Sequence, residues 1–404
     1  WNTGVGVGFS PPRKNQDKEW IAADMTNSPY RHNLYMTWTE FDRYGSASTA
    51  DSTRILCSRS TDAGATWSTP VRVSDRSGDC IDSDNTVEGA VPAIGPNGEV
   101  YTAWSGPLGI MFDKSTDGGV TWGGDIFVSD QPGGWDFDIP GINRCNGLPI
   151  TACDMSNSPH RGNIYVNWSD QRNGAINTDI FLAKSTDGGA TWSPATRVND
   201  DMIAAQQFFT WMTIDQTTGY LYFVFYDRRN TSGNATDVFV ARSTDGGETF
   251  TNFKVSQASF APTSGVFFGD YTNIAAYRGK IYPIWMRLDG SILSVWTAII
   301  NDSVTVGVPR EEGHASSFAL HQNYPNPFNP STMIRFNVPL RERITLKVFD
   351  VLGREIAILV DAYMDPGEHT VAFSGWDYGL ASGTYFYRMT AGGFTETKRL
   401  ILLQ

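Results

Sequence analysis

The octet Ser60–Trp67, STDAGATW, occurs four times in this chain with little change. It returns as STDGGVTW at 115–122, as STDGGATW at 185–192 and as STDGGETF at 243–250. Self-similarity at intervals of this size is the mark of a chain built from repeated supersecondary units. The octet therefore predicts a repeat architecture and directs attention to the segments around it.

Short segments that alternate apolar and polar residues surround every octet. Before it come RILCSRS (54–60), GIMFDKS (109–115), DIFLAKS (179–185) and DVFVARS (237–243). After it comes another, such as STPVRVSD (68–75), and two more lie upstream in each repeat. A period of two indicates β-strands and argues against helices. Each repeat is thus four antiparallel strands, a to d, and four-stranded units repeated radially form a β-propeller.

The octet itself has the chemistry of a tight turn between strands c and d. Its aspartate can accept backbone N–H bonds within the turn, the glycine two places later tolerates a left-handed conformation, and the last Trp or Phe can wedge against a neighbouring sheet. The octet resembles the Asp-box, or BNR repeat, of sialidases and related propellers. The resemblance implies structural aspartates on the end of the propeller away from the ligand pocket: Asp62, Asp117, Asp187 and Asp245.

The sequence pattern leaves the number of sheets open between five and six. Five b segments can be found, the last being KIYPIWMR (280–287). The opening WNTGVGVG (1–8) repeats WSTPVRVS (67–74), Trp on Trp and Val on Val. We therefore interpret Trp1–Phe9 as an outer d strand, which either closes the fifth sheet or belongs to a sixth. The fold expected for 1–302 is an all-β Asp-box propeller with five visible blades and room for six.

The repeat stops before a polar linker at 303–317. Residues 318–404 contain alternating strands separated by hairpin signals, which predicts a small Ig-like β-sandwich. The segments YPNPFNPST (324–332) and VFDVLGRE (348–355) resemble the C-terminal sorting domain of the type IX secretion system. This resemblance implies export across an outer membrane, with the secretion machinery as a partner, and a secreted, extracellular or cell-surface location.

Composition excludes several partners. The net charge is −12, and the first 317 residues carry all of it. Such a surface repels nucleic acid and anionic lipid. No run of about eighteen apolar residues occurs, so no transmembrane span is expected. The sequence has no glycine-rich phosphate loop, and we expect no organic cofactor.

Two features of the d–a loops predict stabilising bonds. Cys80 and Cys145 lie in d–a loops of adjacent repeats, so outside the cytoplasm we expect them to form a disulfide. The stretch GDCIDSDNTVEG (78–89) is dense in oxygen ligands, which suit Ca²⁺. The predicted ligands are Asp79, Asp82, Asp84 and Glu88.

The sialidase resemblance implies arginines that hold a carboxylate, a Tyr–Glu nucleophile pair and an Asp acid/base. On the b–c turns it points to four substrate-binding arginines: Arg43, Arg172, Arg228 and Arg287. Asp-Arg pairs recur from sheet to sheet, however, which also fits a scaffolding role, and the sialidase Arg-Ile-Pro signature is absent. A catalytic group should be singular, and the least repetitive polar residues on this face are Asp270, Tyr271, Glu88 and Asp136.

Two functions follow and both stay open at this point. One is a secreted sialidase-like glycoside hydrolase acting on acidic glycans. The other is a non-catalytic extracellular propeller that binds glycans or proteins, or that self-assembles.

Overall fold

The computed structural model describes residues 4–8, 14–302 and 317–403. The chain divides into two compact units, Trp1–Ser303 and Val304–Gln404. Within the described residues no helix is long and apolar enough to cross a membrane.

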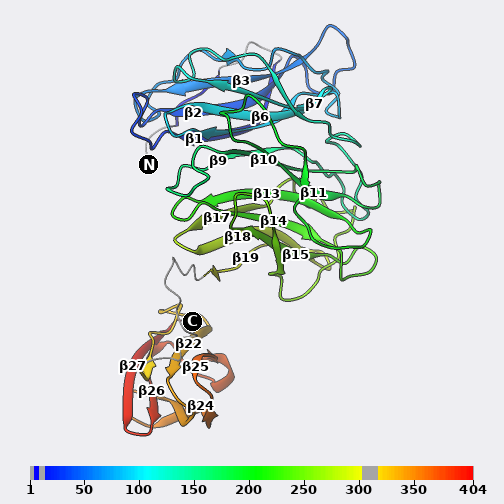
Figure 1. Cartoon of the computed structure of the whole chain (residues 1–404). Coiled ribbons are helices and arrows are strands. Elements are labelled where there is room, and N and C mark those ends of the chain that lie inside the picture. The colour runs from blue at the N-terminus through cyan, green and yellow to red at the C-terminus, as the bar shows by residue number, and fades with distance from the viewer. Residues whose placement is uncertain (1–3, 9–13, 303–316, 404) are drawn as a thin grey trace. The chain divides into compact units, whose positions relative to one another are not determined.

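The first unit is a succession of five antiparallel sheets (Figure 1). Sheet 1 consists of β1 (Asn15–Ala23), β2 (Leu34–Phe41), β3 (Thr53–Ser60) and β4 (Val71–Arg72). Sheet 2 consists of β5 (Glu88–Ile94), β6 (Val100–Gly106), β7 (Gly109–Ser115) and β8 (Ile126–Ser129). Sheet 3 consists of β9 (Ile150–Cys153), β10 (Ile164–Asp170), β11 (Asp179–Ser185) and β12 (Thr196–Arg197). Sheet 4 consists of β13 (Gln207–Asp215), β14 (Tyr220–Asp227), β15 (Asp237–Ser243) and β16 (Thr251–Lys254). Sheet 5 consists of β17 (Asn273–Tyr277), β18 (Lys280–Asp289) and β19 (Ile292–Thr297), with β20 (Ile300–Asn301) pairing with β18.

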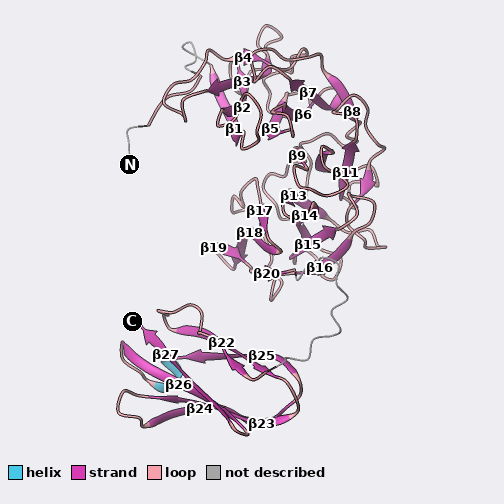
Figure 2. Cartoon of the chain, turned by 60° about the vertical axis from the view of Figure 1, so that its left-hand side comes forward, coloured by secondary structure: helices cyan, strands magenta, loops and turns pink. Residues whose placement is uncertain are grey.

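The sheets follow one another around a common centre, with their first strands innermost (Figure 2). Neighbouring first strands touch, from β1 and β5 through to β13 and β17. Trp20 of sheet 1 and Trp211 of sheet 4 meet in the middle, with ring centroids 4.6 Å apart. The predicted all-β propeller is therefore confirmed, and its described part has five sheets.

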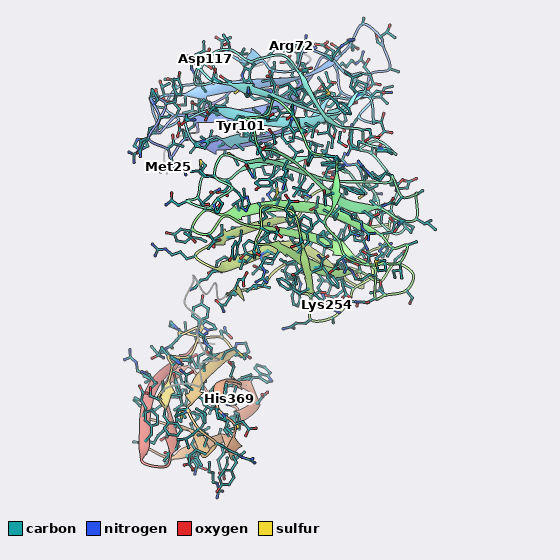
Figure 3. The ribbon with its side chains drawn as sticks, viewed as in Figure 1. Met25, Arg72, Tyr101, Asp117, Lys254 and His369 are labelled. Atoms are coloured by element: carbon teal, nitrogen blue, oxygen red, sulfur yellow. The ribbon has the colours of Figure 1, made fainter. Side chains whose placement is uncertain are left out.

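The octets form the turns between the third and fourth strands. Asp117 accepts the backbone N–H groups of Val120 and Thr121, both at 3.0 Å, and the Thr121 hydroxyl at 2.6 Å. Burial would raise the pKa of Asp117, but the hydrogen bonds from Thr121 and Ser115 lower it to about 2. Figure 3 places Asp117 at the same end of the sheets as Met25, which follows β1. Asp62, Asp187 and Asp245 make the equivalent bonds, so all four aspartates have turn-forming contacts.

In the second, third and fourth octets, the glycine packs against the sheet before it. Gly119 has a φ of +76°, and a Cβ there would lie 3.1 Å from the ring of Tyr35 on sheet 1. A side chain is therefore disfavoured both by the backbone and by the neighbour. The last aromatic residue of the third octet, Trp192, packs against Phe112 of sheet 2 at 5.0 Å. Each copy of the octet thus makes a turn, and the second, third and fourth copies also make a contact with the preceding sheet.

Residues 4–8 are not in a strand, and residues 1–3 and 9 of the predicted outer strand lie outside the described residues, as does nearly all of the predicted linker. The second unit is a sandwich of two sheets. One contains β21 (Ala319–Leu320), β22 (Ser331–Val338) and β25 (Gly367–Ser374); the other contains β24 (Glu355–Met364), β23 (Glu342–Phe349), β26 (Gly383–Ala391) and β27 (Phe394–Leu402). Both inner faces contribute to one buried cluster, with Phe336 and Phe373 on one side and Leu346 and Tyr387 on the other. The expected β-sandwich is confirmed.

Candidate functional site

The end of the propeller opposite the octets is where the first strands begin, and three of these strands carry a local distortion there. The pairing registers of β1, β5 and β13 each shift by a bulge at this end. Lys18, Gly89 and Phe209 sit at the three bulges with φ values of +55°, +87° and +50°. Bulges re-aim side chains out of the regular alternation. Here they turn residues of three sheets toward the mouth of the central channel.

Arg144 connects three of the loops around this mouth. Its Nε donates to Asp270 Oδ1 at 3.0 Å and its Nη2 to Asp270 Oδ2 at 2.8 Å, a bidentate pair. Its Nη1 lies 3.6 Å from Asp82 Oδ2. The loops before β5, β9 and β17 are therefore linked through a single guanidinium group.

Lys18 and Glu88 lie together, buried, beside the Arg144–Asp270 pair. Lys18 Nζ lies 3.3 Å from Glu88 Oε2, and the Glu88 side chain is wholly buried. Burial raises the pKa of Glu88 to about 8, although Lys18 acts in the opposite direction. Below that pH the carboxyl holds a proton, which is unusual for a glutamate and puts it within range of acid–base chemistry.

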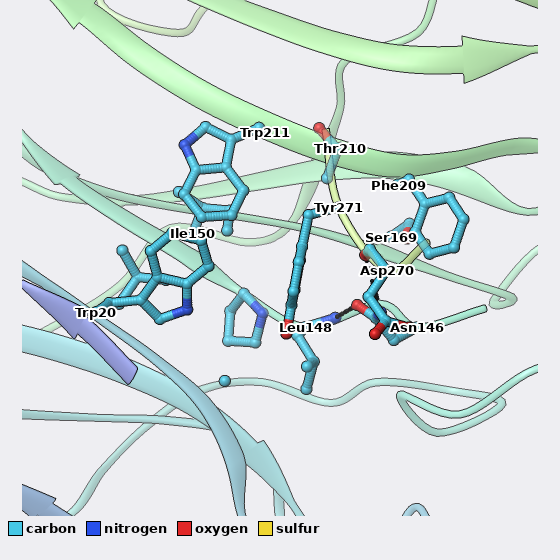
Figure 4. A pocket seen from close by; sticks show the side chains of 13 residues that line it. Trp20, Asn146, Leu148, Ile150, Ser169, Phe209, Thr210, Trp211, Asp270 and Tyr271 are labelled. Atoms are coloured by element: carbon cyan, nitrogen blue, oxygen red, sulfur yellow. Dashed lines mark hydrogen bonds between the residues drawn. The ribbon is translucent and has the colours of Figure 1, made fainter. Parts of the chain in front are cut away.

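Next to these groups lies a narrow pocket, whose free space in this structure amounts to about one water molecule. Figure 4 shows its two sides, an apolar one with Trp20, Ile150 and Trp211 and a polar one with Asn146, Ser169 and Asp270. The complete lining is Trp20, Gly89, Val91, Asn146, Leu148, Pro149, Ile150, Ser169, Phe209, Thr210, Trp211, Asp270 and Tyr271.

The polar side of the pocket is held by specific contacts. Asn146 Nδ2 donates to the Asp270 carbonyl at 3.0 Å. The Ser169 hydroxyl is buried and has no hydrogen-bond partner among the residues that the structure describes. Tyr271 stands edge-on to Trp20, with ring centroids 5.6 Å apart, and burial raises the pKa of its phenol. The pocket thus combines aromatic faces with hydrogen-bonding groups at fixed positions.

The four predicted catalytic residues separate into two groups. Asp270 and Tyr271 line the pocket, and Glu88 is buried immediately before the lining residue Gly89. Asp136 does not line the pocket: its backbone bridges to that of the lining residue Asn146, and its N–H donates to Asp84 Oδ1 at 2.9 Å. Burial and then the charge of Asp84 raise its pKa.

None of the four predicted substrate-binding arginines lines the pocket. Arg172 pairs with Asp170 at 2.6 Å and Arg287 with Asp289 at 2.7 Å. Arg43 is exposed. These geometries favour the scaffolding interpretation of the repeated Asp-Arg pairs, because each partner is only two residues away on the same turn.

Arg228 differs from the other three. It is buried, lies 5.3 Å above the Phe208 ring and donates from Nε to the Thr236 hydroxyl at 3.0 Å. Burial lowers its pKa to about 10. This arginine packs within the protein rather than facing the pocket.

The predicted disulfide is wrong in this structure. Cys80 and Cys145 are separate, buried thiols. The backbone of Cys80 forms a bridge with Ser46 in the preceding repeat, whereas the Cys145 carbonyl accepts the Phe137 N–H within its own loop. The two loops are held by different backbone partners, which sequence position alone does not reveal.

The predicted calcium ligands do not assemble either. Asp79 accepts the Thr86 hydroxyl at 2.9 Å, Asp82 accepts the Tyr44 hydroxyl, and Asp84 accepts a backbone N–H, while Glu88 faces Lys18. Across residues 4–8, 14–302 and 317–403, no three His, Cys, Asp or Glu side chains are grouped as a metal ion would require. Calcium binding by this chain stays a prediction, without a ligand set.

Four contributors to the site were not predicted from the sequence. Lys18 and the two central tryptophans lie in segments, DKEWIAADM and FTWMTID, that carry only an ordinary strand pattern. Arg144 had a weak signal, since it is the one arginine in its d–a loop and only the preceding d–a loop, with Arg76, also carries one.

Residues 322–403 match the family model of the secretion system C-terminal sorting domain. The chain therefore carries an export signal of the type IX system, which directs proteins to the cell surface or the extracellular space. No curated protein matches the chain in sequence.

Several solved structures resemble the chain at low identity. The α-L-arabinofuranosidase Arb93A from Fusarium graminearum is 15% identical, with 91% of this chain and 100% of that one covered and a TM-score of 0.39. The GH62 α-L-arabinofuranosidase from Coprinopsis cinerea is 11% identical, covers 74% and 95%, and has a TM-score of 0.40. The Hadza microbial sialidase Hz136 is 16% identical, covers 70% and 65%, and has a TM-score of 0.28. Likenesses at this level of identity and TM-score say nothing of activity.

Proposed function

We propose that the first unit is an exported glycan-binding propeller, in which the narrow central pocket opens to hold one sugar ring. The observation that carries this is the pairing of an aromatic wall with a hydrogen-bonding wall inside one pocket. A sugar ring offers apolar C–H groups on its faces and hydroxyls around its edge. Trp20 and Trp211 suit the faces, and the groups of Asn146 and Asp270 suit the hydroxyls.

The charge of the pocket supports a neutral sugar rather than an acidic one. Asp270 is the only Asp, Glu, Lys or Arg among the residues that line it. The nearest guanidinium, that of Arg144, has both its Nε and its Nη2 committed to Asp270. A ligand carboxylate would meet the charge of Asp270, and the ammonium of Lys18 already lies 3.4 Å from the Asp17 carboxylate, so like charges would come close together.

Hydrolysis is a second candidate function, favoured by Glu88. Glycoside hydrolysis needs a carboxylic acid that is protonated at working pH and a second carboxylate beside it. The raised pKa of Glu88 satisfies the first need and Asp270 the second. In that reaction Glu88 would give its proton to the leaving glycosidic oxygen while Asp270 takes a proton from the attacking water. The complete burial of Glu88 weighs against it, since the acid must reach the bond.

A binding and release assay separates the two functions. The pure 404-residue chain is titrated with a panel of neutral and acidic oligosaccharides, and release of reducing sugar is followed in parallel. Asp270→Asn should weaken binding of a neutral glycan by about tenfold or more, because a hydrogen bond to a charged group contributes about 1.5–3 kcal/mol. Asp289→Asn, which breaks the Arg287 pair away from the pocket, is the matched control and should leave binding unchanged.

Each outcome assigns the function. Binding without release supports the lectin-like role, and release that Glu88→Gln abolishes while binding persists assigns hydrolysis. The proposal fails if no neutral glycan binds, or if only acidic glycans bind.

A further inference from the structure

The end of the propeller opposite the octets has a second hollow, which is larger than the central pocket. It is a groove of about 390 Å³, whereas the central pocket has room for about one water molecule. Its lining comes from the loop before β5 (84–85), the turn between β6 and β7 (106–109) and the loop before β9 (130–134). Small-molecule sites commonly measure about 300–1,000 Å³, so the groove already has the size of such a site.

The groove brings together apolar and hydrogen-bonding side chains. Pro107, Leu108 and Pro132 form its apolar part, and Leu108 is 48% exposed although it is a large apolar residue. Asn85 is exposed, and so is 76% of the Asp130 side chain, which puts an amide and a carboxylate within reach of a ligand. This combination suits a sugar ring, which has apolar C–H faces and a rim of hydroxyls.

Asp84 is held in the wall of the groove by a neighbouring loop. Its Oδ1 accepts the Asp136 N–H at 2.9 Å. Gly134 packs directly on this carboxyl group, because its φ is +73° and a Cβ there would lie 1.9 Å from Asp84 Cγ. Both the backbone and the neighbour therefore exclude a side chain at position 134. The groove is thus shaped by contacts that exist without a ligand.

One buried side chain separates the groove from the central pocket. Gln131 lines the groove, and its Nε2 donates to the Gly147 carbonyl at 2.7 Å and to the Ser169 carbonyl at 3.4 Å. Ser169 lines the central pocket, and Gly147 follows the lining residue Asn146. Gln131 Oε1 accepts the Ser105 hydroxyl at 2.8 Å, so both ends of the amide are held. The two hollows are therefore neighbours, one side chain apart.

The charge of the groove matches that of the central pocket. The charged residues that line it are Asp84 and Asp130. Arg172 Nη2 lies 3.9 Å from Asp130 Oδ1, but the same nitrogen is 2.6 Å from Asp170 Oδ2. A glycan with carboxylates or sulfates would bring like charges together here, as it would beside Asp270. One neutral oligosaccharide therefore suits both hollows.

We propose that the groove is a second sugar subsite, which holds the next ring of a neutral oligosaccharide whose terminal ring occupies the central pocket. This subsite depends on the glycan-binding function proposed for the central pocket, and it makes the ligand a chain of at least two neutral sugars. The chain passes over Gln131, with its second ring against Leu108 and its hydroxyls toward Asn85 and Asp130.

The test is calorimetric titration of the 404-residue chain with the mono-, di- and trisaccharides of glucose, xylose, arabinose, mannose and galactose. In a series that binds, the disaccharide should have a Kd about tenfold or more below that of the monosaccharide, because it gains hydrogen bonds to Asn85 and Asp130. In the double variant Asn85→Ala, Asp130→Ala this gain should disappear while monosaccharide binding persists. Asp270→Asn should instead weaken binding of both sugars.

Asp200→Ala is the matched control. Asp200 has a 48% exposed side chain in the following loop, before β13, and does not line the groove, so both affinities should stay unchanged. Because Asn85 and Asp130 are exposed, the double variant should keep the melting temperature of wild type, which checks that it folds.

The outcomes separate the groove from the central pocket. The second subsite is overturned, and the central pocket stands, if the disaccharide binds no more tightly than the monosaccharide or if the gain survives in the double variant. Binding that the double variant weakens and Asp270→Asn does not would put the sugar in the groove alone, which contradicts a chain that spans both hollows. If no sugar of the panel binds, both the subsite and the proposed function are wrong.

Discussion

Glu88→Gln should change the pH dependence of stability in a defined direction. The pKa of Glu88 is about 8 in the folded protein against 4.5 for an ordinary glutamate. Between these values the folded state holds a proton that the unfolded state has lost. The free energy of unfolding therefore falls as pH rises, by up to about 1.4 kcal/mol per pH unit across this window. The contribution of the Glu88 proton to the free energy of unfolding is complete below pH 4.5 and is lost by pH 8.

The assay is urea unfolding of wild type and Glu88→Gln between pH 5 and pH 8.5. Other buried carboxyls with raised pKa values, such as Asp113 at about 7, contribute equally to both proteins. The difference between the two curves therefore isolates Glu88: wild type should lose stability relative to the variant as pH rises, by about 3 kcal/mol between pH 5 and pH 7.5. Parallel curves would refute the raised pKa and, with it, the case for Glu88 as a proton donor.

Three further predictions follow from the octets and the thiols. Asp117→Ala removes the acceptor of the Val120 and Thr121 N–H groups and should lower the free energy of unfolding by about 1–2 kcal/mol in urea titration. Gly119→Ala should lower the stability of the fold by more than a glycine-to-alanine change at an open turn would, because a Cβ here would press on Tyr35. A melting temperature within 1 °C of wild type, on the order of measurement error, would contradict this. Since the cysteines are free, dithiothreitol should leave the melting temperature unchanged. A fall in the melting temperature would instead support a Cys80–Cys145 disulfide.

The repeated octet was sufficient to predict the fold, because turn chemistry and strand alternation are local properties of the sequence. It also predicted that the d–a loops lie on one face, and in the structure Asp270 and Tyr271 line the pocket there with Glu88 beside it, while their role stays a prediction. Their detailed environment was not predictable. Whether an arginine such as Arg172 faces a ligand or its own Asp170 depends on a rotamer, and both arrangements fit the same letters.

The bulges explain most of what was missed. A one-residue shift in register at Lys18 redirects a side chain that regular alternation would place elsewhere, and no residue type in DKEWIAADM signals it. The disulfide prediction was wrong for a related reason. Equivalent loops of adjacent repeats can form hydrogen bonds with different backbone partners, and the repeat pattern does not show which.

The meeting of Trp20 and Trp211 has a spectroscopic consequence. Two indoles with centroids 4.6 Å apart and planes inclined by 52° couple their electronic transitions, which produces a paired positive and negative band in circular dichroism. The two rings belong to sheets on opposite sides of the centre, so the signal requires the ring of sheets to be assembled rather than each sheet to be merely folded. This paired band therefore reports, without any added label, whether sheets 1 and 4 are in contact at the centre.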